Sequence, residues 1–217
     1  MKLKSVLFDL DGTLVDSLED LTDAVNHVRY FFSQPPLASS TVCKMVGKGA
    51  LNLIQQALPD CGSSDIDRAL RLFLDYNATH IVDKSRLYPG VTEMLDVLQS
   101  KGLRLAVVSN KSEALSRLIL KSLGIHEYFE IISGGDTFKE SKPSPLPLLR
   151  VLEQQGVEPH ECIMVGDSIN DIQAGNLAGI ATVGCSWGYG DSDELSQSVF
   201  FADSCDDLIR TIMEQVA

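Results

Sequence analysis

The sequence predicts an α/β fold: a doubly wound parallel sheet that carries an inserted α-helical cap. From residue 88 onward, short apolar segments alternate with segments of helical periodicity, which is the pattern of strands joined by crossover helices. A buried strand at 4–10 opens the chain. Residues 17–82 show only helical spacing, so a helical block interrupts the sheet after its first strand.

The helical block follows directly on the first strand. That strand ends in Asp9-Leu10-Asp11-Gly12-Thr13, a polar run typical of a tight turn. Two apolar stripes at helical spacing come next, one beginning at Leu18 and the other at Ile66. Pro35-Pro36 and Gly47-Lys48-Gly49 divide the region into separate helices.

The alternation after Tyr88-Pro89-Gly90 is regular. Helices are predicted at 91–101, 112–123, 145–155, 171–178 and 206–216. Strands are predicted at 104–109, 130–133, 162–165, 181–183 and 199–201. Strands buried on both faces form continuous apolar runs, as most of these do. We therefore expect residues 1–15 and 86–217 to form an α/β core and residues 16–85 to form a cap domain.

Composition and charge exclude several classes of protein. Hydrophobic residues make up 44% and charged residues 22% of the 217-residue chain, as in ordinary globular proteins. With 18 basic and 30 acidic residues the net charge is −12, which disfavours binding to nucleic acid or to an anionic membrane. Asp9 cuts off the first apolar segment, and no apolar run approaches the ~18 residues of a membrane span. We expect a cytoplasmic protein, either a monomer or a small homo-oligomer.

The cysteines and histidines predict neither a disulfide framework nor a zinc site. The five cysteines are odd in number and none forms a C-x-x-C pair, and the four histidines are isolated. Asn77-x-Thr79 matches a glycosylation sequon, but without a secretory signal the match is attributed to chance.

Polar clusters follow the strands of the predicted sheet, at the edge where parallel sheets bind ligands. A single cluster is explained equally well by a helix cap or a turn. Clusters at four successive strand ends are harder to explain in that way. Their members are Asp9 and Asp11, Ser109 and Asn110, Lys142, and Asp167 with Asp171.

Carboxylates gathered at one edge repel one another and need a cation. Oxygen ligands without histidine or cysteine suit a hard ion, and Mg²⁺ is the usual choice. Such an ion, with Lys142, the Ser109 hydroxyl and free turn N–H groups, would hold a phosphate dianion. One carboxylate could then attack phosphorus while a second transfers protons. The pair Asp9 and Asp11 fits this division, because close carboxylates separate each other's pKa values.

Four motifs in these clusters resemble those of the haloacid dehalogenase-like superfamily, in the same order and over essentially the whole chain. They are Asp9-Leu10-Asp11-Gly12-Thr13-Leu14-Val15-Asp16-Ser17, Ser109-Asn110-Lys111, Lys142-Pro143 and Gly166-Asp167-Ser168-Ile169-Asn170-Asp171. Within the superfamily, the chain is most similar to bacterial phosphoglycolate phosphatases. That similarity is carried by Val46-Gly47-Lys48-Gly49-Ala50, Ser133-Gly134-Gly135-Asp136, Lys142-Pro143-Ser144-Pro145 and Trp187-Gly188-Tyr189-Gly190.

The resemblance implies a role for each carboxylate. Asp9 would be the nucleophile and a Mg²⁺ ligand. Asp11 would protonate the leaving alkoxide and then activate water, with its backbone carbonyl also on the metal. Asp167 would be the third metal contact, and Asp171 would order the metal's hydration or support Lys142.

The resemblance also implies the activity. Ser109, the Asn110 N–H and Lys142 would hold the transferring phosphoryl group. The chain would be a Mg²⁺-dependent phosphomonoester hydrolase that forms an aspartyl-phosphate and acts on a small phosphorylated metabolite, 2-phosphoglycolate. The cap turn at 29–36 lacks the glycine that the resemblance predicts there.

Lys48 is the candidate substrate contact in the cap. Its flanking glycines let the turn bring a cation to the mouth of the site, where it would suit the carboxylate of 2-phosphoglycolate. The alternative is a solvated loop lysine.

Several other functions share parts of this pattern. A phosphosugar mutase, a pyrophosphatase or a phosphonate hydrolase would share the four motifs, and the last would need Lys44 or Lys48 as a Schiff-base lysine. A true dehalogenase would leave Asp11 without a role. A receiver domain is about half this length and has an adjacent acidic pair. Gly184-Cys185-Ser186-Trp187-Gly188 matches a nucleophile elbow, but no histidine follows it.

Overall fold

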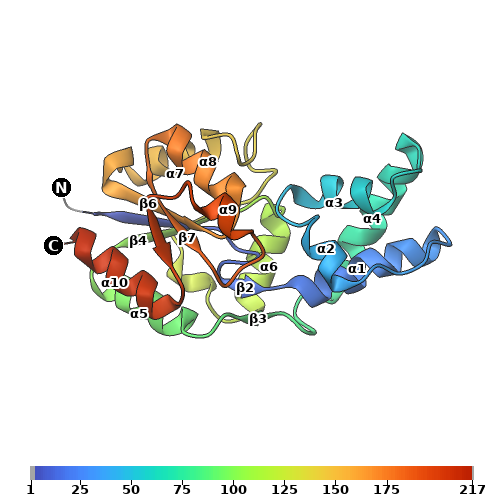
Figure 1. The fold of residues 1–217 in the computed structure, drawn as a ribbon, viewed down its shortest axis with the longest axis horizontal. Coiled ribbons are helices and arrows are strands. Elements are labelled where there is room, and N and C mark those ends of the chain that lie inside the picture. Colours follow the sequence, from blue (N-terminus) through green and yellow to red (C-terminus); the bar gives the residue numbers. More distant parts are fainter. Residues whose placement is uncertain (1–2, 217) are drawn as a thin grey trace.

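A six-stranded parallel sheet organises the core in the computed structural model, which describes residues 3–216 (Figure 1). Its strands in spatial order are β5 (Ile131–Ser133), β4 (Arg104–Val108), β1 (Ser5–Phe8), β6 (Cys162–Gly166), β7 (Ala181–Cys185) and β8 (Phe200–Ala202). The first strand is central, and Phe8 is in register with Val107 on one side and Val165 on the other. The carboxyl ends of β4, β1 and β6 therefore lie together at one edge.

Helices cover both faces of the sheet, because alternate strand residues point to opposite sides. Val6 and Phe8 belong to a hydrophobic cluster with three helices, and Leu7 belongs to a second cluster with two others. The first face carries α5 (Val91–Ser100), α6 (Glu113–Ser122) and α10 (Cys205–Val216), and the second carries α7 (Leu146–Gln155) and α8 (Ile169–Ala178). This confirms the doubly wound α/β prediction.

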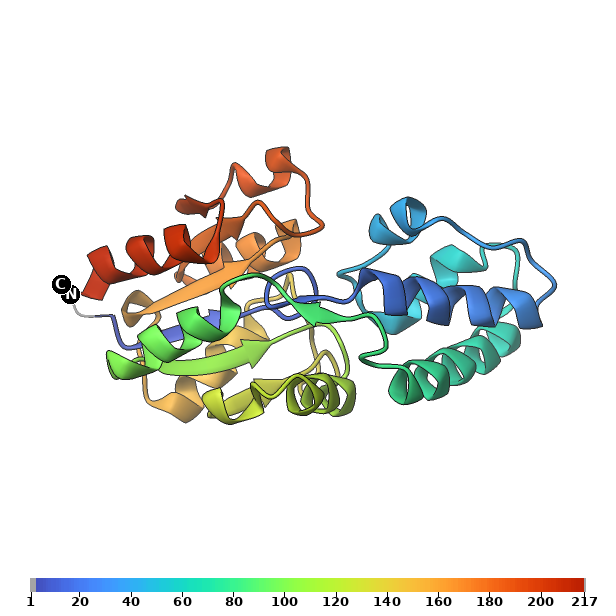
Figure 2. The ribbon, with the colours of Figure 1, turned by 90° about the horizontal axis from the view of Figure 1, so that it is seen from below.

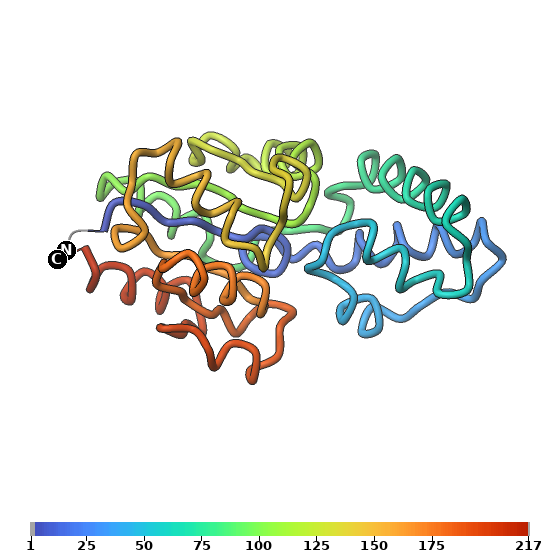
Figure 3. Tube along the Cα trace, turned by 90° about the horizontal axis from the view of Figure 1, so that it is seen from above, coloured from blue at the N-terminus to red at the C-terminus, as the bar shows by residue number. Residues whose placement is uncertain are grey.

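Four helices form the inserted cap: α1 (Leu18–Phe31), α2 (Ser39–Cys43), α3 (Gly49–Ala57) and α4 (Ser63–Thr79). They enclose a third hydrophobic cluster, which includes Leu21, Val25, Ile66 and Phe73 from the two predicted stripes. Figures 2 and 3 show the cap beyond the carboxyl ends of the strands, while β1 begins and α10 ends at the opposite end of the core.

The two chain segments that join the cap to the core run side by side. They pair as a short antiparallel ladder between β2 (Val15–Asp16) and β3 (Arg86–Leu87). The sequence did not predict these strands, because two-residue segments carry no periodicity. The domain division at 15/16 and 85/86 stays a prediction, which limited proteolysis of the connecting segments would check.

Asp20 fastens the same two segments together. This buried side chain at the start of α1 accepts hydrogen bonds from the backbone N–H groups of Lys84 (3.0 Å) and Ser85 (2.8 Å) and from the Ser85 hydroxyl (2.6 Å). A carboxylate with several donors is a strong anchor. The two segments that connect the cap to the core are therefore fixed to each other by these hydrogen bonds.

The remaining short elements connect the larger ones. They are the 3₁₀ turns η1 (His126–Tyr128) and η2 (Pro159–Glu161) and the short helix α9 (Ser192–Leu195). The turn after α1, where the resemblance predicts a glycine, instead places Ser33 at φ 52°, a left-handed conformation that costs a non-glycine residue about 1–2 kcal/mol. Among the helices of residues 3–216, none combines the length and the apolar character needed to cross a bilayer.

Candidate active site

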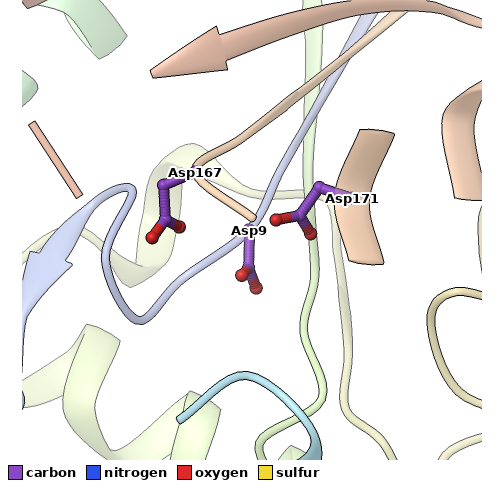
Figure 4. Close-up of side chains that lie close together, drawn as sticks. All are labelled: Asp9, Asp167 and Asp171. Carbon is purple, nitrogen blue, oxygen red and sulfur yellow. The ribbon is translucent and has the colours of Figure 1, made fainter. Parts of the chain in front are cut away.

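Three predicted site carboxylates meet at the centre of the sheet edge. Asp9 follows β1, Asp167 follows β6, and Asp171 lies in the first turn of α8. All three are buried, and each offers an oxygen within 4.8 Å of the others (Figure 4). The register of the adjacent parallel strands β1 and β6 brings them together.

Close backbone packing fixes Asp167. Its two oxygens accept hydrogen bonds of 2.8 Å from the Thr13 hydroxyl and from the Tyr189 backbone N–H. Gly12 has φ 91°, and a Cβ there would lie 2.2 Å from an Asp167 oxygen. A Cβ at Gly188 would lie 2.3 Å from the Asp167 Cβ. These two glycines let the loops approach the carboxylate from both sides.

Substituting Gly188 with Ala should lower kcat/KM at least tenfold. Its new methyl group would overlap Asp167 and the Gly12 carbonyl oxygen, 2.4 Å away, so Asp167 must move, and small displacements in a site are costly. Gly62→Ala is the matched control, since a Cβ there meets nothing within 4 Å. Steady-state kinetics that gave the Gly188 variant wild-type activity would show that Asp167 need not be fixed.

Lys142 supplies the positive charge among these carboxylates. It comes from the loop between β5 and α7 and is buried. Its ammonium lies 2.5 Å from Asp171 Oδ1 and 2.9 Å from Asp9 Oδ1. The Asn110 side chain positions it by accepting from the Lys142 backbone N–H (2.9 Å) and donating to its carbonyl oxygen (2.8 Å).

Burial and mutual repulsion raise the pKa values of two carboxyls. The pKa of Asp9 rises to about 6, first because burial disfavours its charge and next because Asp171 is close, while Lys142 opposes the rise. The pKa of Asp167 rises to about 8 through burial and the charges of Asp171 and Asp9. Burial alone would lower the pKa of Lys142, but its attraction to Asp171 and Asp9 outweighs this and the net shift is upward.

Asp11 lies nearer to solvent and has different partners. The Lys111 ammonium lies 3.2 Å from each of its carboxylate oxygens, and the Ser17 hydroxyl donates to Oδ1 over 2.6 Å. Both the lysine and the carboxylate are largely buried. Sequence reasoning gave Lys111 no role, although it stands in the Ser109-Asn110-Lys111 motif. The position of Lys111 directly after the strand-end cluster could have indicated a role in the site.

Ser109 and Asn110 lie at the same edge, after β4, but their side chains already have protein partners. The Ser109 hydroxyl accepts from the Lys111 backbone N–H over 3.3 Å. The Asn110 amide, besides holding Lys142, donates to the Gly47 carbonyl of the cap over 2.8 Å. Asn170 donates to the same carbonyl over 3.3 Å, so the turn that contains Lys48 is tied to the core.

Two hollows open between cap and core above these residues. The wider one has a volume of about 520 Å³ and is lined by Asp9, Asp11 and Asp167 together with Lys44 and Lys48. Lys48 is exposed there and makes no ion pair with any described residue. The smaller hollow, of about 50 Å³, also begins at Asp9 and Asp11 and extends under α3 and α4.

The donor set fits a hard divalent cation. Asp9 Oδ1 is buried and, within residues 3–216, accepts no well-aligned hydrogen bond, because its contact with Lys142 is an ion pair without hydrogen-bond geometry. With all four carboxylates ionised, four negative and two positive side chains give the site a net charge of −2, which one Mg²⁺ would neutralise. Those side chains are Asp9, Asp11, Asp167, Asp171, Lys111 and Lys142.

Comparisons with known proteins agree with this geometry. Residues 6–185 match the family described as haloacid dehalogenase-like hydrolase. A phosphoglycolate phosphatase of Chromobacterium violaceum is 40% identical over 198 residues and 89% of each chain, and one of Aquifex aeolicus is 40% identical over 187 residues and 86% of each chain. A crystal structure of a predicted phosphoglycolate phosphatase from Haemophilus somnus superposes with a TM-score of 0.93 at 33% identity, covering 97% of this chain and 98% of that one. The chain therefore belongs to the haloacid dehalogenase-like hydrolases.

Proposed function

We propose that this protein is a Mg²⁺-dependent phosphatase that hydrolyses a small phosphomonoester, 2-phosphoglycolate, through a covalent aspartyl-phosphate. The observation that carries the proposal is the Asp9 carboxylate, which lines the cleft and lies beside the Lys142 ammonium and two further carboxylates. The curated relatives at 40% identity bear the name of this activity.

Asp9 and Asp11 have different roles in the proposed reaction. An Asp9 oxygen attacks phosphorus, so that an O–P bond forms while the ester O–P bond breaks and its electron pair leaves with the alkoxide. Asp11 gives its proton to that alkoxide. It later takes a proton from the water that attacks phosphorus, while the Asp9 O–P bond breaks, its electron pair returns to the Asp9 carboxylate and phosphate is released. Lys111 and Ser17 hold the Asp11 carboxylate in one orientation for both transfers.

Residues at the strand ends stabilise the negative charge of the transferring phosphoryl group. Lys142, the Ser109 hydroxyl and the Asn110 backbone N–H bind the phosphoryl oxygens. Mg²⁺ held by Asp9, Asp167 and the Asp11 carbonyl would offset the phosphate charge. Asp171 acts as a positioning residue for Lys142, because Oδ1 contacts the ammonium while Oδ2 accepts from the Ser168 N–H and hydroxyl.

A substrate panel tests the proposal. We expect 2-phosphoglycolate to give the highest kcat/KM among phosphoglycolate, phosphosugars, nucleotides and pyrophosphate, with Mg²⁺ required. Conversion of one phosphosugar isomer into another would favour a mutase. Trapping of a cap lysine by borohydride and phosphonoacetaldehyde would favour a phosphonate hydrolase.

Mg²⁺ should raise the melting temperature more at pH 8 than at pH 6. In the metal-free protein the raised pKa values of Asp167 (about 8) and Asp9 (about 6) exceed the value of about 3.9 for an unfolded aspartate. Their contribution to stability is therefore complete below about pH 4 and is lost as pH rises through 6 and 8. Bound Mg²⁺ removes this loss, because it favours the ionised carboxylates.

Differential scanning fluorimetry at the two pH values, with and without Mg²⁺, measures the effect. Asp167→Asn should abolish most of the pH dependence of the Mg²⁺-induced shift. Equal shifts at pH 6 and pH 8 in the wild-type protein would contradict the metal assignment.

Lys48 is proposed as the cationic contact of the wide cleft. Its removal in Lys48→Ala should raise KM for 2-phosphoglycolate about tenfold, the effect of one lost charged contact. Hydrolysis of p-nitrophenyl phosphate should change little. Lys121→Ala, on an exposed face of α6, is the control. Unchanged KM for both substrates would leave Lys48 a solvated loop residue.

A further inference from the structure

The smaller hollow has a chemistry of its own. Asp9, Asp11 and Lys111 of the proposed catalytic site line one end of it. The residues that the cap contributes to its lining are mainly apolar. The apolar walls of the hollow are Leu21, Val46, Ala50, Leu53 and Phe73, with Leu115 from the core. Its volume of about 50 Å³ is small beside the 520 Å³ of the wide cleft. It therefore suits a short substrate tail better than a sugar or a nucleoside.

One polar group of the cap reaches this hollow from α4. Asn77 lies one helical turn after Phe73, so the two side chains share a face of the helix. Asn77 is 1% exposed, and its Oδ1 is buried without a hydrogen-bond partner among residues 3–216. Of the buried side-chain atoms that lack a partner in that range, only those of Asp9 and Asn77 line this hollow.

A buried amide without a partner is costly to the free protein. Leaving such a group unsatisfied costs about 1–3 kcal/mol, and an apolar residue of the same size would avoid this. The helix does not need the polar group, since leucine fits a helix better than asparagine does. The amide nitrogen also makes no hydrogen bond to any described residue, so it can donate to an anionic group that enters the hollow.

We propose that Asn77 determines substrate specificity by donating a hydrogen bond to the carboxylate of the substrate. The phosphate end would lie at Asp9, the methylene group against the apolar walls, and the carboxylate between the Asn77 amide and the Lys111 ammonium. Lys111 has three donors and contacts the two Asp11 oxygens, so it can also face the tail. This inference rests on the proposed function and assigns the residue that recognises the carboxylate end of the substrate. Lys48 lines the wide cleft and not the smaller hollow, so it would attract the carboxylate as the substrate enters, before the carboxylate reaches Asn77.

The test compares two substrates that differ only in the carboxylate, 2-phosphoglycolate and ethyl phosphate. In Asn77→Leu the KM for 2-phosphoglycolate should rise about tenfold or more, with kcat within about twofold, because one charge-assisted contact is lost. The KM for ethyl phosphate should stay the same or fall. Asn52→Leu is the matched control, because Asn52 is half-buried on α3, bonds to Gln56 and does not line either hollow.

Two further measurements separate recognition from a structural role. Asn77→Asp should raise KM for 2-phosphoglycolate about 100-fold through repulsion between carboxylates, and much less for ethyl phosphate. The melting temperature of Asn77→Leu should equal or exceed that of the wild type, since no protein contact is lost. A lower melting temperature with both substrates equally impaired would overturn the assignment.

The outcome also distinguishes this inference from the function on which it rests. If the wild type hydrolyses 2-phosphoglycolate and the Leu variant keeps the same ratio of kcat/KM between the two substrates, the inference alone fails. If the wild type does not hydrolyse 2-phosphoglycolate, the proposed function fails and the inference fails with it.

Discussion

Replacing Asp9 with Asn should lower kcat on the order of 10³-fold or more, the scale seen when a nucleophile is removed, and leave the fold intact. The amide has the size of the carboxyl but is a poor nucleophile. Burial and Asp171 raise the pKa of Asp9 to about 6, so at pH 7 folding carries the cost of an ionised group in an unfavourable place. The neutral amide avoids that cost. We therefore expect the metal-free variant to melt at the same temperature as the wild type or a higher one.

Loss of activity combined with equal or greater stability is the signature of a group retained for function. Rapid quenching with 2-phosphoglycolate should reveal an acid-stable phosphoenzyme in the wild type and none in Asp9→Asn. Asp83→Asn, at an exposed carboxylate outside both hollows, should behave like the wild type in every assay. Activity of Asp9→Asn within tenfold of the wild type would end the covalent mechanism.

The fold could be predicted because its large elements repeat a pattern. Continuous apolar runs such as Cys162–Val165 and the stripes from Leu18 and Ile66 report burial directly. The elements that could not be predicted show no hydrophobic periodicity in the sequence. The β2–β3 ladder depends on two segments far apart in the chain meeting at the base of the cap. The turn at Ser33 is held in its left-handed conformation by structure around it, against the preference of its own side chain.

The candidate site likewise has a part that could be predicted from the sequence and a part that could not. Asp9 and Asp167 could be found because a parallel sheet brings its strand ends to one edge, whatever the details of packing. The contacts of Lys111 with Asp11, and of the Asn110 amide with Lys142 and Gly47, depend on side-chain directions that no spacing rule contains. Asn77 stands in a helix whose sequence shows only where its apolar face lies. Its importance becomes visible once the cap is placed over the core.

Truncating Lys142 to Ala should lower kcat by about 10²–10³-fold, the usual cost of removing one group that stabilises charge in the transition state. The ammonium lies between Asp9 and Asp171, and Lys142 as a whole is 3% exposed. Without it Asp9 and Asp171 lose the only cation with which they form an ion pair among the described residues, and the phosphoryl oxygens lose a donor. Breaking a buried ion pair from one side also leaves uncompensated charge, which destabilises a protein by about 3–5 kcal/mol.

The direction of the stability change can be worked out. Lys142 lowers the pKa of Asp9 in the wild type, so its removal must raise that pKa further. Ionisation of Asp9 then opposes folding over a wider range, and the loss of stability grows as pH rises. The variant should therefore fall below the wild type in melting temperature by more at pH 8 than at pH 5.

Three variants make the interpretation specific. Lys139→Ala, at an exposed residue of the same loop, controls for loss of net charge and should change neither activity nor the pH dependence. Lys142→Met keeps the aliphatic volume and should be as inactive as Lys142→Ala, because the missing element is charge. Lys142→Arg keeps the charge but not the shape, since a planar guanidinium cannot occupy the place of an ammonium between two buried carboxylates. A loss of tenfold or less in both Lys142→Ala and Lys142→Met would place this lysine outside phosphoryl transfer and leave it only the task of holding Asp9 and Asp171 together.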